Sequence, residues 1–333
     1  MVRCLALAEA LVADGWLVRF ACTPESVLLA PDILRRYPDS IADLPDVDGA
    51  VELVRRLGPD AHRKVDLMVV DGYGFGADEE VMLAGISRVV LAVDDMPSRP
   101  HTVDVLLDQT LGRTPQDYAA VLPDHATALC GSNFALLRAP FIKRRAAGLA
   151  PVATGERLRL LVNFGLTDAS NATGLALDAL AQLDVDVTVV LGQHAPHATS
   201  VLTSVARGGE AWRLAGEVDA DTMARLIAEA DAVIGAPGSA SYERCCLARP
   251  SLMLVLADNQ RPNAAALVKA GAACVLGDAD ALSHEQIAPM LARLLADRTG
   301  LRAMSEAAAR VVDGLGAYRV AIALRRLCPM ATP

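Results

Sequence analysis

The sequence predicts an α/β protein of two domains, each built on a doubly wound parallel sheet. Short, nearly continuous Val- and Leu-rich runs alternate with amphipathic helical segments along the 333 residues. This alternation is typical of parallel sheets that helices cover on both faces. Residues 143–159, near the middle of the chain, are rich in Ala, Gly, Pro and Arg, a composition typical of an interdomain linker. We therefore expect an N-terminal domain at residues 1–145, a C-terminal domain at residues 146–333, and a cleft between them.

The apolar runs mark the expected strands, and the segments with helical periodicity mark the expected helices. Strands are predicted at residues 16–21, 66–70, 89–93, 105–107, 127–130, 158–164, 185–191, 211–214, 232–234, 251–256 and 273–276. Helices are predicted at residues 2–13, 51–57, 79–86, 172–181, 220–230, 241–247, 261–270, 284–296 and 301–313. A last helix, at residues 318–327, is expected to pack back on the first domain.

The first predicted element is a helix, at residues 2–13. A doubly wound domain normally opens with a strand and a glycine-rich turn that leads into the first helix. One interpretation is that this fold simply begins with a helix. We favour the other, that the first strand and its Gly-rich loop are missing from this chain.

Composition excludes several classes of protein. Hydrophobic residues make up 53% and charged residues 21% of the chain, which is not the composition of a disordered protein. A net charge of −9 and 4% aromatic residues argue against a nucleic-acid partner. No apolar segment approaches the roughly 20 residues of a membrane span, and no signal peptide is present, so a cytoplasmic protein is expected. The seven cysteines form no Cys-x-x-Cys motif, which predicts reduced thiols and no zinc site.

The most informative motif is the turn from Gly235 to Ser241, which joins the strand at 232–234 to the helix at 241–247. Its small residues let backbone N–H groups approach an oxyanion, and a helix N-terminus adds partial positive charge. We predict a diphosphate cradle here, with the amides of Gly238 and Ser239 and the hydroxyls of Ser239 and Ser241 as donors. An ordinary turn with a serine cap fits the position alone equally well. Polar groups at neighbouring strand ends favour the cradle.

Two of these strand ends are Phe164–Asp168 and Asp258–Gln260. Ligands bind at the carboxyl ends of strands in such sheets, and side-chain amides both donate to and accept from sugar hydroxyls. We therefore include Gly165, Thr167, Asn259 and Gln260 among the predicted site residues, although helix caps would account for both segments. Glu243, in the first turn of the following helix, either accepts from ribose hydroxyls or only interacts with the helix dipole.

In the first domain, Tyr73 lies between two glycines at the end of a predicted strand. A phenol at such a position donates to developing negative charge or holds a water, although a half-buried tyrosine in a flexible turn is equally consistent. Asp94 and Asp95 end another strand and are better explained as caps than as a metal site. His101, a single loop histidine, is more typical of a structural role than of a general base. We expect no metal and no cofactor.

Several of these segments together resemble the UDP-2,4-diacetamido-2,4,6-trideoxy-β-L-altropyranose hydrolases of pseudaminic acid biosynthesis. The similarity lies in residues 3–11, 71–74, 93–109, 235–245 and 250–260, and extends over nearly the whole chain. Its most specific part is Gly-Ser-x-Ser-aromatic-Glu-Arg-Cys followed by Pro-Ser-Leu-x-Leu-x-Leu-Ala-x-Asn-Gln. This family is related in fold to the MurG-type glycosyltransferases. The resemblance implies a GT-B arrangement of two Rossmann-like domains, with UDP held mostly by the second.

The resemblance also implies a reaction. Water attacks the anomeric carbon, the sugar inverts, and UDP leaves; the free sugar is later built into pseudaminic acid for flagellin or surface glycans. Tyr73 and Asn259 would orient the water or the sugar, Gly238 and Ser239 would hold phosphate, and Glu243 would hold the ribose. The base of the family is a histidine in a Gly-x-Gly-His turn before the helix that matches residues 2–11, a position that falls just ahead of Met1.

Some residues depart from the family pattern. Pro237 replaces a glycine of the cradle and removes one N–H donor. Leu166 replaces a glycine of a Phe-Gly-Gly loop, Thr110 stands where asparagine is usual, and Asn133-Phe134 replaces Tyr-Ala. These differences are compatible with UDP-sugar recognition and leave the identity of the sugar open. The alternatives are a glycosyltransferase with an acceptor in place of water, and a non-catalytic nucleotide-sugar binding protein that lacks the histidine.

Overall fold

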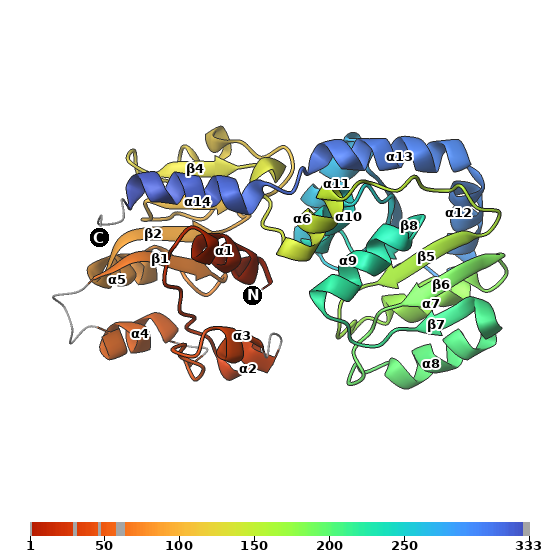
Figure 1. Cartoon of the computed structure of the whole chain (residues 1–333), viewed down its shortest axis with the longest axis horizontal. Coiled ribbons are helices and arrows are strands. Elements are labelled where there is room, and N and C mark those ends of the chain that lie inside the picture. The colour runs from red at the N-terminus through yellow and green to blue at the C-terminus, as the bar shows by residue number, and fades with distance from the viewer. Residues whose placement is uncertain (1, 29–31, 46–47, 58–63, 329–333) are drawn as a thin grey trace. The chain divides into compact units, whose positions relative to one another are not determined.

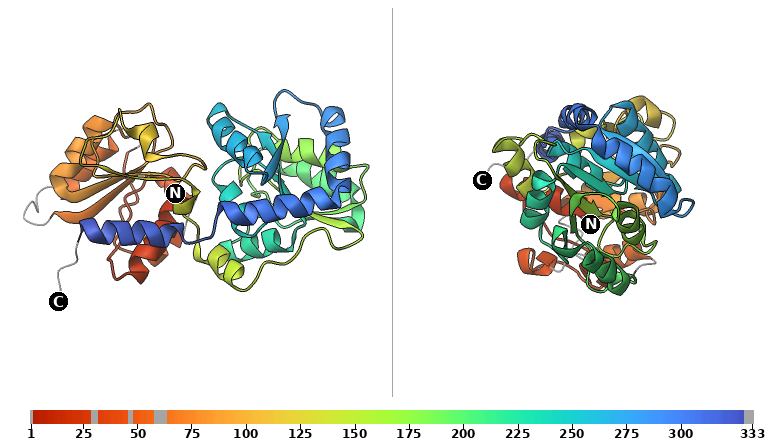
Figure 2. Two further views of the ribbon diagram at one scale, coloured as in Figure 1. Left: turned by 90° about the horizontal axis from the view of Figure 1, so that it is seen from above. Right: turned by 90° about the vertical axis from the view of Figure 1, so that its right-hand side faces the viewer.

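The computed structural model describes residues 2–28, 32–45, 48–57 and 64–328. The chain divides into two compact units, Met1–Ala139 with Leu315–Pro333, and Pro140–Gly314 (Figure 1). Each unit contains one parallel sheet with helices packed against it (Figure 2). The predicted fold class, two parallel-sheet α/β domains, is therefore confirmed. None of the described helices is both long enough and apolar enough to span a membrane.

The first unit has a four-stranded sheet in the order β1-β2-β3-β4, with all neighbours parallel. Its strands are β1 (Val65–Asp71), β2 (Ser87–Val93), β3 (Val105–Asp108) and β4 (Thr127–Cys130). Its helices are α1 (Val2–Ala13), α2 (Pro24–Leu28), α3 (Asp32–Arg36), α4 (Gly49–Leu57), α5 (Ala77–Ile86) and α14 (Gly316–Leu327), with short 3-10 turns η2 (Pro115–Tyr118) and η3 (Ser132–Phe134).

Side-chain alternation along the strands builds a core on each face of this sheet. Leu91 of β2 belongs to a cluster with Leu7 of α1 and Val320 of α14. Its neighbour Val90 belongs to a second cluster, together with Leu83 of α5. Successive strand residues point to opposite faces, so both faces of β2 are buried, as its continuous apolar sequence predicts.

The second unit has a six-stranded parallel sheet in the order β10-β9-β8-β5-β6-β7. Its strands are β5 (Leu158–Asn163), β6 (Val185–Val189), β7 (Trp212–Leu214), β8 (Ala232–Gly235), β9 (Ser251–Val255) and β10 (Ala273–Asp278). Its helices are α6 (Ala139–Ala146), α7 (Ala172–Leu180), α8 (Ala198–Arg207), α9 (Ala220–Glu229), α10 (Ala240–Cys246), α11 (Arg261–Lys269), α12 (His284–Ala296) and α13 (Arg298–Val311), with 3-10 turns η4 (Gly209–Ala211) and η5 (Asp258–Gln260).

The strand order of the second unit reverses between β5 and β8. From β5 the chain builds outward through β6 and β7, and from β8 it builds the other way through β9 and β10. In open α/β sheets ligands bind outside the carboxyl ends of the strands at such a switch point. Asn163 and Gly235 are paired in register at the ends of these two strands, so this pair marks the expected binding edge.

The predicted strand at residues 16–21 is not a regular strand. Among the described residues, its ladder contact is a single bridge between Ala21 and Ile41. Val18 and Phe20 pack on the small cluster around Ile33, whereas Leu17 is 100% exposed. The alternation that predicted a strand is real, but the described part of the chain offers this segment no neighbouring strand with which to form a ladder.

The segment predicted as an interdomain linker lies inside the second unit. Its first residues complete α6, and Val152 is buried in the core of the second sheet. The backbone N–H of Ala153 donates to Asp231 Oδ1 at 2.9 Å. Most of the segment is exposed, as its composition predicts, but Val152 and Ala153 are buried and tie it to the second unit.

Candidate functional site

The turn between β8 and α10 lies at the switch point of the second sheet. At its start, a Cβ added to Gly235 would lie 2.4 Å from the carbonyl oxygen of Asn163 and 2.4 Å from Nη1 of Arg244. Real Cβ atoms do not approach other atoms so closely, so only glycine fits here. The absence of a side chain lets β5, β8 and a buried arginine meet at one point.

All three carbonyl oxygens at the centre of this turn accept a hydrogen bond from a protein side chain. Nη2 of Arg244 donates to Ala236 O at 2.5 Å, Nδ2 of Asn263 donates to Pro237 O at 2.8 Å, and Oγ of Ser241 donates to Gly238 O at 2.6 Å. The three donors come from α10 and α11. The carbonyl oxygens of the turn therefore point toward the protein interior.

Two backbone N–H groups of the same turn, unlike its central carbonyl oxygens, bind no part of the described chain. Within the part of the chain that the structure describes, the amides of Gly238 and Ser239 have no protein acceptor, and no side chain caps the start of α10. Ser239 is exposed, and Gly238 is partly exposed. Unused backbone N–H groups at a surface attract an anion. The turn therefore presents donors outward and acceptors inward, which is the arrangement that a phosphate requires.

Ser241 and Glu243 are both largely buried on α10. The Ser241 hydroxyl accepts from Asn263 Nδ2 at 3.1 Å while it donates to Gly238, so it supports the turn from inside. Asn263 in turn accepts from Tyr242 Oη at 2.7 Å. Glu243 retains 9% exposure in the helix that follows the turn.

The carboxyl end of β5 supplies the loop with Gly165 and Thr167, both of which are exposed. Gly165 has φ = +103°, a conformation that favours glycine. Asp168 is buried and accepts from the amides of Ala172 and Thr173 at 3.0 and 2.8 Å. Asp168 therefore caps α7, and this role explains its presence without a ligand. The exposed residues of the loop are the ones that a ligand could contact.

The carboxyl end of β9 forms the turn η5, which carries Asn259 and Gln260. Asn259 is exposed, and Gln260 accepts from the amide of Leu256 at 3.1 Å through Oε1. Asp258 pairs with Arg261 at 2.8 Å on the surface. The structure thus brings the predicted residues of the second unit to the carboxyl ends of β5, β8 and β9, on one edge of one sheet.

Tyr73, the remaining predicted site residue, belongs to the first unit and follows β1. Its ring is 53% exposed, and its hydroxyl donates to Asp95 Oδ1 at 2.8 Å. Arg99 holds the turn, because its Nη2 donates to the carbonyl oxygens of Tyr73 and Phe75 at 3.1 and 2.6 Å. The guanidinium carbon of Arg99 also lies 5.9 Å from the centre of the Tyr73 ring.

His101 is buried between two carboxylates of the first unit. Its Nδ1 lies 2.6 Å from Glu80 Oε1, and its Nε2 lies 3.2 Å from Asp94 Oδ2, a contact too poorly aligned for a normal hydrogen bond. Burial would lower the pKa of His101, but the contacts with Asp94 and Glu80 outweigh it and raise the pKa to about 9. His101 is therefore a charged structural group, which agrees with the interpretation favoured from sequence.

Other charged pairs occupy the carboxyl ends of β1 and β3. Arg3 Nη2 lies 2.6 Å from Asp71 Oδ1, and Cys4 Sγ donates to Asp71 Oδ2 at 2.9 Å. Burial alone would raise the pKa of Asp71, but the hydrogen bonds and charge of Arg3 lower it to about 2. Asp108, fully buried, accepts from Arg113 Nε at 2.7 Å.

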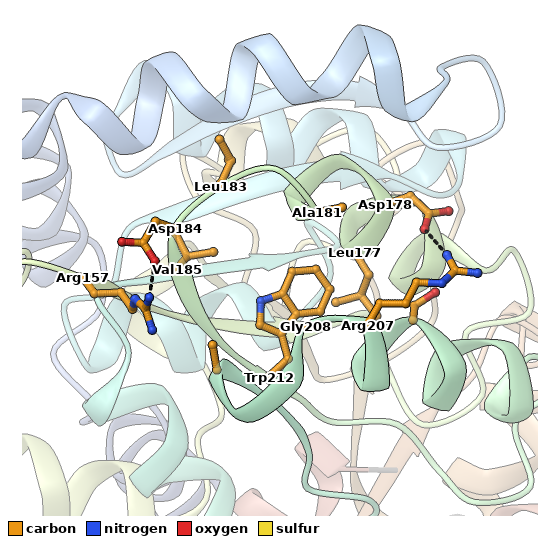
Figure 3. A pocket seen from close by; sticks show the side chains of 12 residues that line it. Arg157, Leu177, Asp178, Ala181, Leu183, Asp184, Val185, Arg207, Gly208 and Trp212 are labelled. Atoms are coloured by element: carbon orange, nitrogen blue, oxygen red, sulfur yellow. Dashed lines mark hydrogen bonds and ion pairs between the residues drawn. The ribbon is translucent and has the colours of Figure 1, made fainter.

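A pocket of about 260 Å³ lies at the opposite edge of the second sheet, at the amino ends of β6 and β7 (Figure 3). The ring of Trp212 lies in it beside Leu177, and the ion pairs Arg157–Asp184 and Arg207–Asp178 flank it. Nucleotide ligands of parallel α/β sheets bind at the carboxyl edge instead. This pocket is therefore not the candidate site.

Sequence reasoning missed Arg244 and Asn263. Arg244 follows Glu243 on α10 and donates to the carbonyl oxygen of Ala236, eight residues earlier in the chain. No local sequence pattern predicts such a contact. Asn263 is the third residue of α11 and follows Pro262, so its place in the sequence does not indicate a contact with the turn. Its role is visible only when α11 lies beside the turn.

Comparison with known proteins matches the part of the second unit that contains the turn. Residues 178–317 match the glycosyltransferase family 28 C-terminal domain, a span that contains the turn, α10 and η5. The chain is 23% identical over 254 residues to the UDP-2,4-diacetamido-2,4,6-trideoxy-beta-L-altropyranose hydrolase of Campylobacter jejuni, covering 76% of this chain and 86% of that protein. It is 27% identical over 172 residues to the spore coat polysaccharide biosynthesis protein SpsG of Bacillus subtilis, half of each chain.

Solved structures agree on the architecture. MurG of Acinetobacter baumannii superposes with a TM-score of 0.66 at 17% identity, over 98% of this chain and 95% of that one. A glycotransferase of kitacinnamycin gives a TM-score of 0.65 at 14% identity, over 98% and 96% of the two chains. The fold is GT-B-like. The resemblance stated from the sequence, to this hydrolase and to MurG-type proteins, is thereby confirmed at the level of the fold and of the shared domain.

Proposed function

We propose that this chain is a UDP-sugar hydrolase of the GT-B type. The observation that carries the proposal is the turn Gly235–Ser241, whose carbonyls are bound by the protein and whose Gly238 and Ser239 amides are not. It lies at a topological switch point, where nucleotides bind in open α/β sheets. The similarity to the Campylobacter jejuni hydrolase over 76% of the chain supports hydrolysis as the reaction.

In this proposal the amides of Gly238 and Ser239 bind the diphosphate, and Glu243 binds the ribose. Gly165 and Thr167 line the same edge from β5, and Asn259 and Gln260 line it from η5. The leaving group is UDP, and hydrogen bonds from fixed amides stabilise the charge that develops on its β-phosphate oxygen as the bond to the anomeric carbon breaks. Water forms the new bond from the opposite face, so the sugar inverts, and the proton that the water loses goes to a base, which in the resembling family is the histidine of the Gly-x-Gly-His turn.

Tyr73 is proposed to hold the water or the sugar. Its hydroxyl donates to Asp95, which fixes the orientation of the phenol. The N-terminal domain would thus supply sugar contacts and the C-terminal domain the UDP contacts. The place of the product in pseudaminic acid synthesis is part of the same proposal and follows from the resemblance alone. The cytoplasmic location expected from the sequence stays a prediction.

The proposal is tested by calorimetry and by product analysis. UDP should bind the purified chain, and the UDP-linked 2,4-diacetamido-trideoxy hexose should release UDP and the free inverted sugar in buffer. The assay uses the chain as it stands and a version extended by a strand and a Gly-x-Gly-His turn. If the extended version binds UDP but releases none from this substrate, hydrolysis is wrong.

A glycosyltransferase is the second candidate, because residues 178–317 match a glycosyltransferase domain. The two activities differ in what receives the sugar. A hydrolase releases UDP in buffer alone, whereas a transferase releases it at a comparable rate only when a sugar or lipid acceptor is added. UDP release measured with and without a panel of acceptors therefore separates the two candidates. UDP binding without turnover under either condition would instead favour a nucleotide-sugar binding protein.

A further inference from the structure

Arg244 is a buried cation beside the candidate diphosphate turn. It is 2% exposed, its Nη2 donates to Ala236 O at 2.5 Å, and its Nη1 lies against Gly235. Its Nε is buried without an acceptor. Throughout residues 2–28, 32–45, 48–57 and 64–328, no carboxylate forms an ion pair with it.

Such a charge is costly to keep. A guanidinium that leaves water loses its hydration, and removal from water is compensated in proteins by an opposite charge or a complete set of hydrogen bonds. Arg244 has neither. Burial lowers its pKa to about 10, which still leaves it protonated at neutral pH. An apolar side chain would fill the same space without this cost. The neighbouring carboxylate of Glu243 raises the pKa of Arg244, but burial outweighs it, so the protein offsets the charge only in part.

The geometry shows what the charge does to the turn. The Ala236–Pro237 peptide has a carbonyl but no N–H, because Pro237 lacks one. Unbound, that carbonyl would present negative partial charge to an approaching phosphate. Arg244 binds it from below, and the next two amides of the turn are left as donors on the exposed side.

We propose that Arg244 is a positioning residue of the diphosphate site, whose buried charge is neutralised by the bound diphosphate rather than by a carboxylate. This inference rests on the proposed function, because it takes UDP as the ligand of the turn. Arg244 acts through the backbone of Gly235 and Ala236 and through its field, which is weakly screened in the protein interior. Its contribution is therefore specific to the anionic part of the ligand.

The chain contains a matched control. Arg249 is 1% exposed, donates through Nη2 to Ala150 O at 2.9 Å, and leaves Nε and Nη1 without acceptors. It precedes β9, so it lies at the amino edge of the same sheet, whereas Arg244 lies at the carboxyl edge. Burial lowers its pKa to about 10 as well. The two arginines differ chiefly in their distance from the turn.

The test compares R244M, R244K and R249M with the wild-type chain. Calorimetry measures the Kd of UDP, competition against UDP measures the Kd of uridine, and thermal unfolding without ligand measures stability. R244M should weaken UDP binding by about ten- to a hundredfold, the range for loss of a charge-assisted interaction, and change uridine binding by less than about threefold. R244K, which keeps the charge, should lie between R244M and the wild type. R249M should bind UDP as the wild type does.

The outcomes separate this inference from the proposed function. If the wild-type chain does not bind UDP, both the proposed function and the role of Arg244 are wrong. A wild-type chain that binds UDP, together with an R244M variant that binds UDP equally well or loses UDP and uridine alike, overturns only the role of Arg244. If R244M does not fold, R244Q replaces it, because glutamine removes the charge and keeps a polar N–H donor. This variant should bind UDP more weakly than the wild type and uridine equally well. A Kd of UDP equal to that of the wild type would overturn the inference.

Discussion

At the carboxyl ends of β1, β2 and β3 in the first unit, each strand is followed or ended by an aspartate paired with an arginine: Asp71 with Arg3, Asp94 with Arg99 and Asp108 with Arg113. At the carboxyl ends of β5 and β8 in the second unit there is a turn of small residues. Beneath it lies the buried Arg244, which forms no ion pair with a carboxylate of the described residues. Both edges belong to parallel sheets. Paired charges bridge the loops of the first edge, whereas the buried charge of the second donates to a backbone carbonyl of the turn.

The sharpest test of this contrast is D108N, for which the largest loss of stability is expected. Asp108 accepts from Arg113, from Tyr118 Oη at 2.9 Å and from the amide of Thr110 at 2.8 Å, all in a buried position. Removing its charge leaves Arg113 without its partner, which costs about 3–5 kcal/mol when such a pair is buried. Chemical denaturation of D108N should show this loss, with the Kd of UDP unchanged.

The control for D108N is the same substitution at an exposed pair. Asp258 and Arg261 form an ion pair at 2.8 Å on the surface of the second unit. Exposed pairs contribute about 0–1 kcal/mol, so D258N should unfold close to the wild type. A similar loss in both variants would mean that burial does not distinguish the two kinds of pair.

The second prediction concerns the unpaired edge. In G235A, the added methyl would lie 2.4 Å from both Asn163 O and Arg244 Nη1, and a backbone atom cannot move away as a flexible side chain can. Overpacking of this kind costs about 1–3 kcal/mol, and the displaced turn should lose measurable UDP affinity. Thermal unfolding and calorimetry measure the two effects. G238A is the control for stability, because no atom lies within 4 Å of the Cβ it would add, and it should unfold like the wild type.

These contrasts also show what the sequence could and could not predict. The strands were predictable because contiguous apolar residues must be buried on both faces, as Val90 and Leu91 show. The segment at 16–21 has the same local pattern, but a strand also needs a neighbour, which local sequence does not reveal.

The turn at Gly235–Ser241 was predictable from its small residues. Ser241 was expected to donate to the ligand, and the structure instead shows its hydroxyl bound within the turn. The contributions of Arg244 and Asn263 depend on how α10 and α11 pack, and no spacing in the sequence encodes that packing.

The third prediction uses pH to test the paired edge. The pKa of His101 is raised from its ordinary value of 6.5 to about 9 by Glu80 on α5 and Asp94 after β2, with Arg99 paired to the same Asp94. A raised pKa means that the folded state binds the proton more tightly than the unfolded state. The stabilisation is therefore complete below pH 6.5 and is lost as the pH rises toward 9. We expect a loss on the order of 1–2 kcal/mol over that range.

Denaturation curves at pH 6.5 and pH 9 measure this effect in the wild type and in H101Q. The glutamine variant has no proton to lose there, so its stability should change less over the same interval. An equal loss of stability in the wild type and in H101Q would mean that groups other than His101 cause the pH dependence. UDP binding at the two pH values should be unaffected by the H101Q change, because His101 and the turn belong to different units.

The smallest effect on stability is expected for Y73F, and it tests whether the paired edge also serves the reaction. The substitution keeps the ring and its contact with Arg99 but removes the hydrogen bond from the hydroxyl to Asp95. Because the side chain is 53% exposed, the loss of this bond should cost less than about 1 kcal/mol. If Tyr73 orients the attacking water, turnover should fall by roughly ten- to a hundredfold, as misplacement of a reacting group does, while the Kd of UDP stays the same. Steady-state UDP release and calorimetry separate the two quantities. Unchanged turnover in Y73F would mean that Tyr73 has no part in the reaction. The paired charges at the carboxyl ends of β1, β2 and β3 would then only stabilise the loops of the first unit.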